Sequence, residues 1–229
     1  MLFERTFHTL KILGNERLQL PIFYESPVSL RFETGDPSLE IFLTEKKLNP
    51  KYLRSALWRT SFLYEKVAPF DTLLWVLYRT PDLDTDVDEI IDRFCRLVHL
   101  PSPAEVYQQD VTTAAEEPMT RILLFWDIED TPPKIQPLFE EIVHSDFKDL
   151  GFRELSSAVF FFDTKRHLLF HPYDDRGVDI VGQTTEDIRF LYEDCRNWLL
   201  DYDIERMKTT FEQSKPLVKL VVCTRPRRA

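Results

Sequence analysis

Two nearly uninterrupted apolar stretches, Asp71–Arg79 and Arg121–Asp127, dominate the hydrophobic pattern and predict strands that are buried on both faces. A segment with apolar residues every three or four positions follows each of them, at about residues 85–98 and 131–143. That spacing predicts amphipathic helices. We therefore expect two strand–helix units that pack onto one sheet.

The N-terminal part of the chain gives weaker signals. Residues Ser29–Thr34 alternate between apolar and polar side chains and stop at Gly35-Asp36-Pro37, which predicts a strand and a turn. Asn49 followed by Pro50 predicts the start of a helix that presents one apolar face as far as Val67. The first thirty residues show no clear period.

The C-terminal third predicts a β-meander and two helices. Ser157–Asp163, His167–Pro172 and Val178–Val181 are short apolar runs separated by turn residues. Thr184 is typical of a helix cap, and residues 204–211 carry a second, shorter amphipathic pattern. The fold class that follows is α+β, with a mixed or antiparallel sheet, helices packed mainly on one face, and a C-terminal meander followed by two helices.

The chain length fits one domain over residues 1–229. It also allows two strand–helix halves, 20–100 and 119–223, of which the second ends in a strand over 217–223. Residues 101–118 are rich in proline, glutamine and threonine, so we expect a surface loop there.

Composition indicates a folded cytoplasmic protein. Hydrophobic residues make up 43% of the chain and charged residues 30%, and no apolar run approaches the roughly 20 residues of a membrane helix. The start of the chain lacks a signal-peptide pattern, and the three cysteines, Cys95, Cys195 and Cys223, have no close spacing. We expect free thiols in a reducing compartment and no membrane association.

The net charge of −10 favours a basic protein over nucleic acid as the expected partner. An acidic surface repels nucleic acid and attracts a basic protein. The basic end at Arg225–Ala229 is too short to reverse that expectation. Five glycines and the absence of a glycine-rich phosphate loop give no support for a nucleotide, and we expect no cofactor.

The most distinctive polar segment contains Tyr173, Asp174, Asp175, Arg176 and, after a Gly-Val pair, Asp179. Adjacent carboxylates are typical ligands of Mg²⁺ or Ca²⁺. The same residues also suit a hairpin turn, in which Asp bonds to local backbone and Gly accepts positive φ. Both interpretations stay open at this stage.

Two histidines extend the metal interpretation. His167 and His171 lie four positions apart on a predicted strand and therefore on one face, near Asp179. Two imidazoles and a carboxylate are a known metal-ligand set. We nevertheless expect no metal, and the candidate ligands, if one binds, are His171, Asp174 and Asp175. A metal-dependent enzyme centred on residues 171–179 is therefore one hypothesis, and a polar outer face of the sheet is its alternative.

A second polar and aromatic segment runs from Trp198 through Asp201 and Tyr202 to Asp203. It suits a pocket or a protein interface, where aromatic residues concentrate. It also suits a helix end, with Asp203 as the cap of the next helix, and we favour this interpretation because the spacing fits both helices. A third hypothesis is a small-ligand sensor, whose pocket would draw on four aromatic side chains: Tyr173, Tyr192, Trp198 and Tyr202.

Three segments together carry a resemblance to a known family. Phe170–Ile180, Leu191–Asp203 and Ser29–Glu33 resemble the signature of a family of uncharacterised bacterial domains, a domain of unknown function, over about residues 20–212. The resemblance implies no activity or catalytic residue. It implies a weak link to toxin–immunity gene neighbourhoods, so a non-enzymatic immunity-type inhibitor of a basic toxin is our leading expectation.

Overall fold

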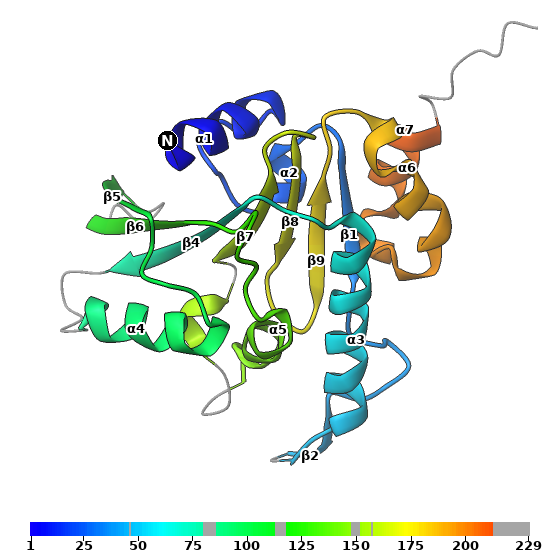
Figure 1. Ribbon diagram of the computed structural model, residues 1–229. Helices are drawn as coiled ribbons and strands as arrows, with labels where there is room; N and C mark the ends of the chain where they lie inside the picture. The colour runs from blue at the N-terminus through cyan, green and yellow to red at the C-terminus, as the bar shows by residue number, and fades with distance from the viewer. Residues whose placement is uncertain (46, 80–85, 113–117, 148–151, 157, 213–229) are drawn as a thin grey trace, which may run out of the picture.

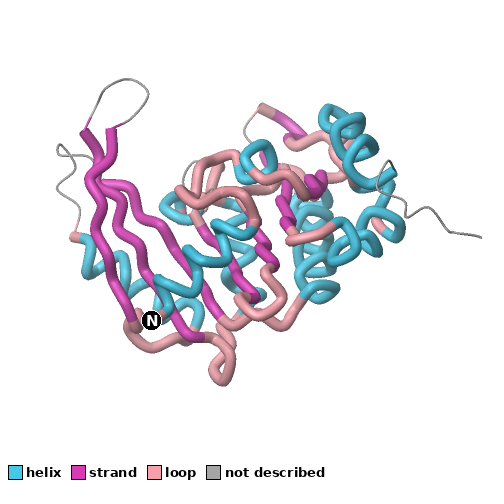
Figure 2. Tube along the Cα trace, turned by 90° about the horizontal axis from the view of Figure 1, so that it is seen from above, coloured by secondary structure: helices cyan, strands magenta, loops and turns pink. Residues whose placement is uncertain are grey.

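The protein folds around one twisted antiparallel sheet of seven strands (Figures 1 and 2). The computed structural model describes residues 1–45, 47–79, 86–112, 118–147, 152–156 and 158–212. Every neighbouring pair of strands in the sheet is antiparallel. The strands lie in the spatial order β1 (Ser29–Glu33), β9 (Gly177–Val181), β8 (Leu168–Pro172), β7 (Val159–Asp163), β4 (Thr72–Arg79), β6 (Pro118–Asp127) and β5 (Glu105–Thr112).

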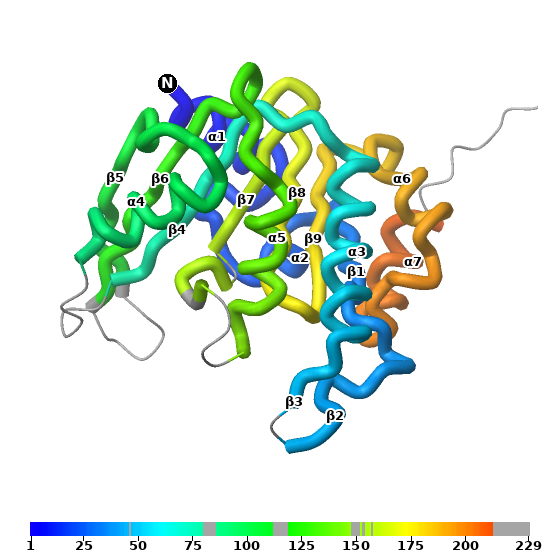
Figure 3. The backbone as a smooth tube through the Cα atoms, turned by 60° about the horizontal axis from the view of Figure 1, so that its bottom comes forward, coloured from blue at the N-terminus to red at the C-terminus, as the bar shows by residue number. Residues whose placement is uncertain are grey.

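Helices cover both faces of the sheet and its β1 end. Three helices lie in a row across one face, and two further helices lie behind the sheet (Figure 3). None of the described helices is both long and apolar enough to cross a membrane. The first face carries α3 (Pro50–Val67), α4 (Val87–Val98) and α5 (Ile135–His144), the second carries α1 (Leu2–Ile12) and α2 (Ile22–Glu25), and α6 (Thr185–Asp194) and α7 (Ile204–Glu212) lie beside β1.

Side-chain alternation along β4 separates two hydrophobic cores. Leu73, Trp75 and Leu77 join the larger core under α3, α4 and α5, and Leu74 and Val76 join the smaller core under α1. A strand with apolar side chains on both faces can lie only at the centre of a sheet that is covered twice. This explains the uninterrupted apolar run in the sequence.

The predicted α+β class with an antiparallel sheet is confirmed. The largest group of helices, α3, α4 and α5, shares one face as expected, but α1 and α2 also cover the other. The β7–β8–β9 meander and the two following helices lie where the pattern placed them. The helix that begins after Asn49 is also confirmed, since the Asn49 side chain accepts a hydrogen bond from the Lys51 amide at 3.0 Å. Thr184 and Asp187 form a reciprocal capping box at the start of α6.

Two parts of the sequence interpretation require correction. The surface loop expected over 101–118 is wrong, because residues 105–112 form β5, and each of them pairs with a residue of β6. The first helix, α1, shows no clear period because two of its four buried positions are threonines, Thr6 and Thr9. The strand expected over 217–223 lies outside the described residues.

A separate two-stranded hairpin, β2 (Phe42–Thr44) with β3 (Lys47–Leu48), precedes α3. Strands from both predicted halves enter the same large sheet, where β4 lies between β7 and β6.

Candidate functional site

The three segments that carry the family resemblance meet at one buried arginine. Arg31 lies in the middle of β1, opposite Asp179 on β9. Its Nε and Nη2 donate to the two carboxylate oxygens of Asp179 at 2.7 and 2.8 Å, a bidentate pair. Asp179 also accepts a hydrogen bond from the Phe23 amide at 3.2 Å, so both of its oxygens are engaged.

A second carboxylate approaches Arg31 from the C-terminal helices. Asp203 Oδ2 lies 3.5 Å from Arg31 Nη1, and Asp203 Oδ1 accepts a hydrogen bond from the Tyr24 hydroxyl at 2.8 Å. The rings of Phe23 and Tyr24 lie 4.8 and 4.9 Å from the guanidinium carbon. Removing three charges from water is costly, and this geometry offsets that cost with bidentate bonds and aromatic contacts. We call these five residues the Arg31 junction.

Sequence reasoning missed Arg31 as a member of the site. It lies between Leu30 and Phe32, which both enter the larger core, so its side chain points to the opposite face of the sheet. A lone charge at that place resembles an ordinary solvent-facing position. The available signal was Asp179, which holds the same place between the apolar residues of β9.

The Asp174–Arg176 segment forms a self-contained turn between β8 and β9. Asp174 accepts hydrogen bonds from the backbone amide of Arg176 at 2.7 Å and from its Nε at 2.8 Å. Arg176 also reaches Asp146 at 3.0 Å. At Gly177 a Cβ atom would lie 2.5 Å from the Phe32 carbonyl oxygen, so the close approach of β1 requires glycine here. The segment therefore has the geometry of a hairpin turn, which was the alternative to a metal site.

Asp175 points away from Asp174 and ties the turn to α3. Its carboxylate accepts a hydrogen bond from the Tyr52 hydroxyl at 2.7 Å, and its carbonyl accepts one from Thr34 Oγ1 at 2.9 Å. Burial raises the pKa of the Asp175 carboxyl, and the Tyr52 hydrogen bond opposes that shift. The two adjacent carboxylates therefore serve different partners and do not share a ligand position.

His171 lies next to the Arg31 junction in the wall of a cavity. It is 2% exposed, stacks on Phe160 with ring centres 4.3 Å apart, and places Nδ1 2.8 Å from the Val159 carbonyl oxygen. A carbonyl only accepts, so Nδ1 carries the proton and Nε2 is the acceptor that the neutral ring keeps. Burial lowers the pKa of His171, which favours this neutral form.

The cavity beside His171 has a volume of about 340 Å³. Its walls are formed by charged residues from the ion pairs described above and by the segment that connects α1 to α2. The lining residues are Leu20, Pro21, Arg31, His171, Tyr173, Arg176 and Asp179.

The other residues proposed for a metal site are separated. His167 lies in the turn before β8 with a φ of 52°, and its Nδ1 lies 3.4 Å from Thr9 Oγ1, so it does not share a strand face with His171. Within the residues that the structure describes, no three His, Cys, Asp or Glu side chains are grouped to hold a metal ion.

The aromatic residues proposed for a ligand pocket have different neighbours. Trp198 packs against Trp58 and Phe62 at ring distances of 5.3 Å, and Tyr192 stacks on Phe211 at 5.0 Å. Tyr202 is 87% exposed and its neighbour Asp201 is also exposed. Of the residues proposed from this segment, the structure brings Asp203 to the Arg31 junction and leaves the others apart.

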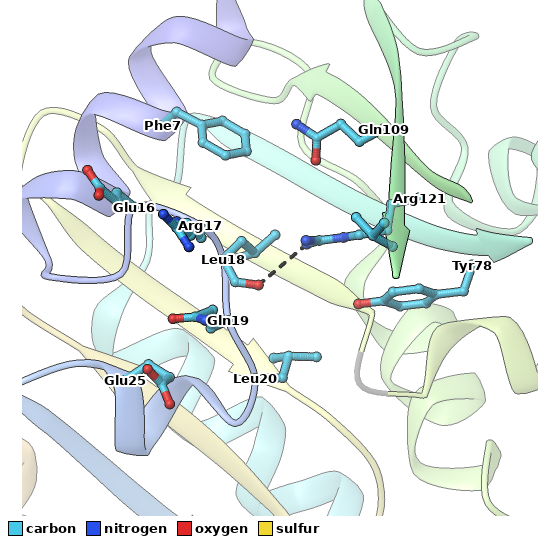
Figure 4. A pocket seen from close by; sticks show the side chains of 11 residues that line it. Phe7, Glu16, Arg17, Leu18, Gln19, Leu20, Glu25, Tyr78, Gln109 and Arg121 are labelled. Carbon is cyan, nitrogen blue, oxygen red and sulfur yellow. Dashed lines mark hydrogen bonds between the residues drawn. The ribbon is translucent and has the colours of Figure 1, made fainter. Parts of the chain in front are cut away.

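A larger hollow of about 830 Å³ lies on the same face of the sheet (Figure 4). Arg121 extends from β6 and donates a hydrogen bond to the Leu18 carbonyl at 3.4 Å, while its Nε is buried without a partner. Phe7 and Gln109 lie on one side of Arg121 in Figure 4, and Glu25 lies across the hollow from it. The charged groups are thus dispersed around the hollow and do not converge on one point.

A third hollow, of about 390 Å³, lies between α4 and β5, and we call it the α4–β5 groove. Two carboxylates, Asp88 and Asp92, stand over a mostly apolar lining, and the described residues that line the groove include no lysine or arginine. Asp86 caps the start of α4, since its side chain accepts hydrogen bonds from the amides of Asp88 and Glu89. The remaining lining residues are Val87, Ile91, Ser102, Pro103, Val106, Gln108 and Ile122.

The fold defines an α+β protein with an antiparallel sheet that is covered on both faces. The family model described as "Domain of unknown function (DUF3885)" matches residues 6–203, and the chain belongs to that family. The match spans the Arg31 junction and the α4–β5 groove. No curated protein and no solved structure matches the chain.

Proposed function

We propose that this chain is a non-enzymatic protein-interaction domain, and that it binds a basic partner protein at the α4–β5 groove. The observation that carries the proposal is the lining of the groove, where two carboxylates stand beside partly exposed apolar side chains. An apolar floor supplies affinity through burial, and carboxylates in a lining whose described residues include no lysine or arginine favour a basic surface.

The charge of the whole molecule acts in the same direction. With 39 acidic and 29 basic side chains, the protein carries a net charge of −10. A negative field of this kind raises the association rate of a positively charged partner and weakens as salt is added. Asp86, Asp88 and Glu89 place three carboxylates at the start of α4, the end of the helix at which Val87 and Asp88 line the groove.

The particular form that we propose is a bacterial immunity-type inhibitor that covers a basic surface of a toxin. Inhibition by coverage needs no catalytic group. This agrees with the internal engagement of the Asp174, Asp175 and Asp179 carboxylates, each of which accepts hydrogen bonds from protein donors. The strong steering of oppositely charged proteins also suits an inhibitor that must bind before its target acts.

The test compares two variants with equal changes in charge. Asp88→Asn with Asp92→Asn removes two carboxylates from the groove, whereas Glu193→Gln with Glu205→Gln removes two exposed carboxylates from α6 and α7 at the opposite end of the molecule. Partners are captured quantitatively from cells at roughly 50 mM and 500 mM salt, between which the Debye length shortens severalfold.

We expect basic proteins to be enriched by the natural chain and by the α6–α7 variant at low salt, and to be lost from the groove variant. Thermal melting establishes that both variants are folded. Equal capture of the same basic proteins by the groove variant would contradict the proposal, and so would a set of captured proteins with no excess of basic members.

A further inference from the structure

The two edges of the large sheet differ in how their backbone groups are used. β1 forms one edge, and the chain after α6 covers it: the Leu200 amide donates to the Arg31 carbonyl at 3.0 Å, and Leu199 forms a bridge with Phe32. β5 forms the other edge and pairs with β6 alone among the described strands. An edge strand directs half of its N–H and C=O groups away from the sheet, where they can pair with another chain.

β5 is long and regular enough to template a further strand. It runs for eight residues in continuous register with β6. Natural edge strands are usually protected by lysine, by proline or by a bulge. The sequence of β5 contains neither lysine nor proline, and its register with β6 has no shift. Its charged side chains, Glu105 and Asp110, are acidic, so they oppose an acidic strand and not a basic one.

The α4–β5 groove gives this edge its specificity. Tyr107 points to the α1 side, where its ring lies 4.4 Å from the ring of Phe3. Val106 and Gln108 point to the α4 side and line the groove, and Val106 is 49% exposed. A strand laid beside β5 would therefore place every second side chain next to the groove, within the field of Asp88 and Asp92.

We infer that the β5 edge binds an extended, basic segment of the partner protein as an eighth strand of the sheet. Main-chain hydrogen bonds provide the affinity, and the α4–β5 groove selects lysine or arginine at the alternate positions that lie next to it. This inference rests on the proposed function, since it names the binding mode at the same site. A second copy of this chain is a poorer occupant, because its own β5 edge brings Asp110 and the carboxylates of α4 toward like charges.

The probe is a synthetic eight-residue peptide of alternating valine and lysine, capped at both ends. Its matched control carries an N-methyl group on every residue, which removes the N–H donors of both edges of the peptide and preserves charge and side chains. Both are titrated into the full chain by fluorescence anisotropy at low salt. Hydrogen exchange of the backbone amides over residues 105–112 is measured with and without the unmethylated peptide.

We expect the unmethylated peptide to bind and to slow exchange in β5, and the N-methylated peptide to bind about tenfold more weakly or worse, because several main-chain bonds are lost. We also expect Asp88→Asn with Asp92→Asn to weaken the unmethylated peptide, and the matched α6–α7 variant to bind it normally.

The two ideas fail in different ways. Equal binding of both peptides, with a loss in the groove variant, would overturn strand addition and leave the acidic groove as the binding surface. Peptide binding that the groove variant leaves unchanged would overturn the proposed function itself. No binding of either peptide, or self-association of the chain with protection of β5, would overturn the inference that the edge receives a basic partner.

Discussion

The two edges of the sheet show two ways of handling the same problem. At the β1 edge, a buried arginine pairs with two carboxylates, and the stretch of chain after α6 donates a hydrogen bond to the backbone of β1. At the β5 edge, acidic side chains surround a backbone that the described strands leave unpaired on one side. The first edge is specified by internal contacts, so substitutions there act on stability. None of the described strands pairs with the outer side of the second edge, so we expect substitutions there to act on binding.

The largest effect is expected from breaking the Arg31 junction. Arg31→Met leaves Asp179 and Asp203 buried without their cation, and we expect the free energy of unfolding to fall by about 3–5 kcal/mol. Urea denaturation monitored by tryptophan fluorescence measures it. The double variant Arg31→Met with Asp179→Leu removes the stranded carboxylate opposite β1 and should recover part of the loss. A loss below about 1 kcal/mol in the single variant would show that the junction contributes little.

An intermediate, pH-dependent effect is expected at His171. Burial lowers its pKa, with the nearby Asp179 carboxylate opposing the shift. Between the folded pKa and the unfolded value of about 6.5, the unfolded chain therefore binds more protons. The stability of the folded state is fully present above about pH 6.5 and decreases as the pH falls, by at most about 1.4 kcal/mol per pH unit for one such group.

His171→Gln tests this dependence, since it removes the titrating group and keeps a hydrogen-bond donor for the Val159 carbonyl. Unfolding free energies are measured from pH 7.5 to 5 for both proteins, so that the other titrating groups cancel in the difference. We expect a shallower loss in the variant. Parallel pH profiles would show that His171 accepts its proton in the folded state as readily as in the unfolded chain.

The smallest change in stability is expected at the open edge. Val106 is half exposed, so Val106→Lys should change the free energy of unfolding by about 0.5 kcal/mol or less. The same variant should weaken the valine–lysine peptide about tenfold, because a lysine in the groove repels it and protects the edge. Leu199→Lys at the closed edge is the matched control, since Leu199 is 4% exposed and its replacement should destabilise the fold strongly. A larger loss of stability in Val106→Lys than in Leu199→Lys would contradict the contrast between the two edges.

The central architecture was predictable because burial leaves a direct trace in the sequence. Uninterrupted apolar runs located β4 and β6, and three short runs located the meander, because these strands are covered on both faces. β5 escaped because an edge strand exposes alternate side chains and needs few apolar residues. α1 escaped because Thr6 and Thr9 occupy buried positions of its inner face.

The candidate sites were predictable only in part. The carboxylates of Asp174, Asp175 and Asp179 stood out in the sequence, and the Arg176 partner of Asp174 lies two residues away in the same turn. The other two partners, Tyr52 for Asp175 and Arg31 for Asp179, are distant in the sequence and are brought there by α3 and by the pairing of β1 with β9. The α4–β5 groove was missed because it combines a helix with a strand that the pattern did not predict.

The Arg31–Asp179 pair also sets an order of events during synthesis. The two residues are separated by 148 positions in the sequence. The strand that pairs with β1 is β9, which comes last in the sequence among the described strands of the sheet. At a translation rate of roughly 5–20 residues per second, β1 leaves the ribosome about 7–30 seconds before β9 exists. During that interval its arginine has no carboxylate from β9 and its backbone has no neighbouring strand. A nascent chain halted between the two segments should therefore engage chaperones through its N-terminal part, and release should coincide with the emergence of the meander.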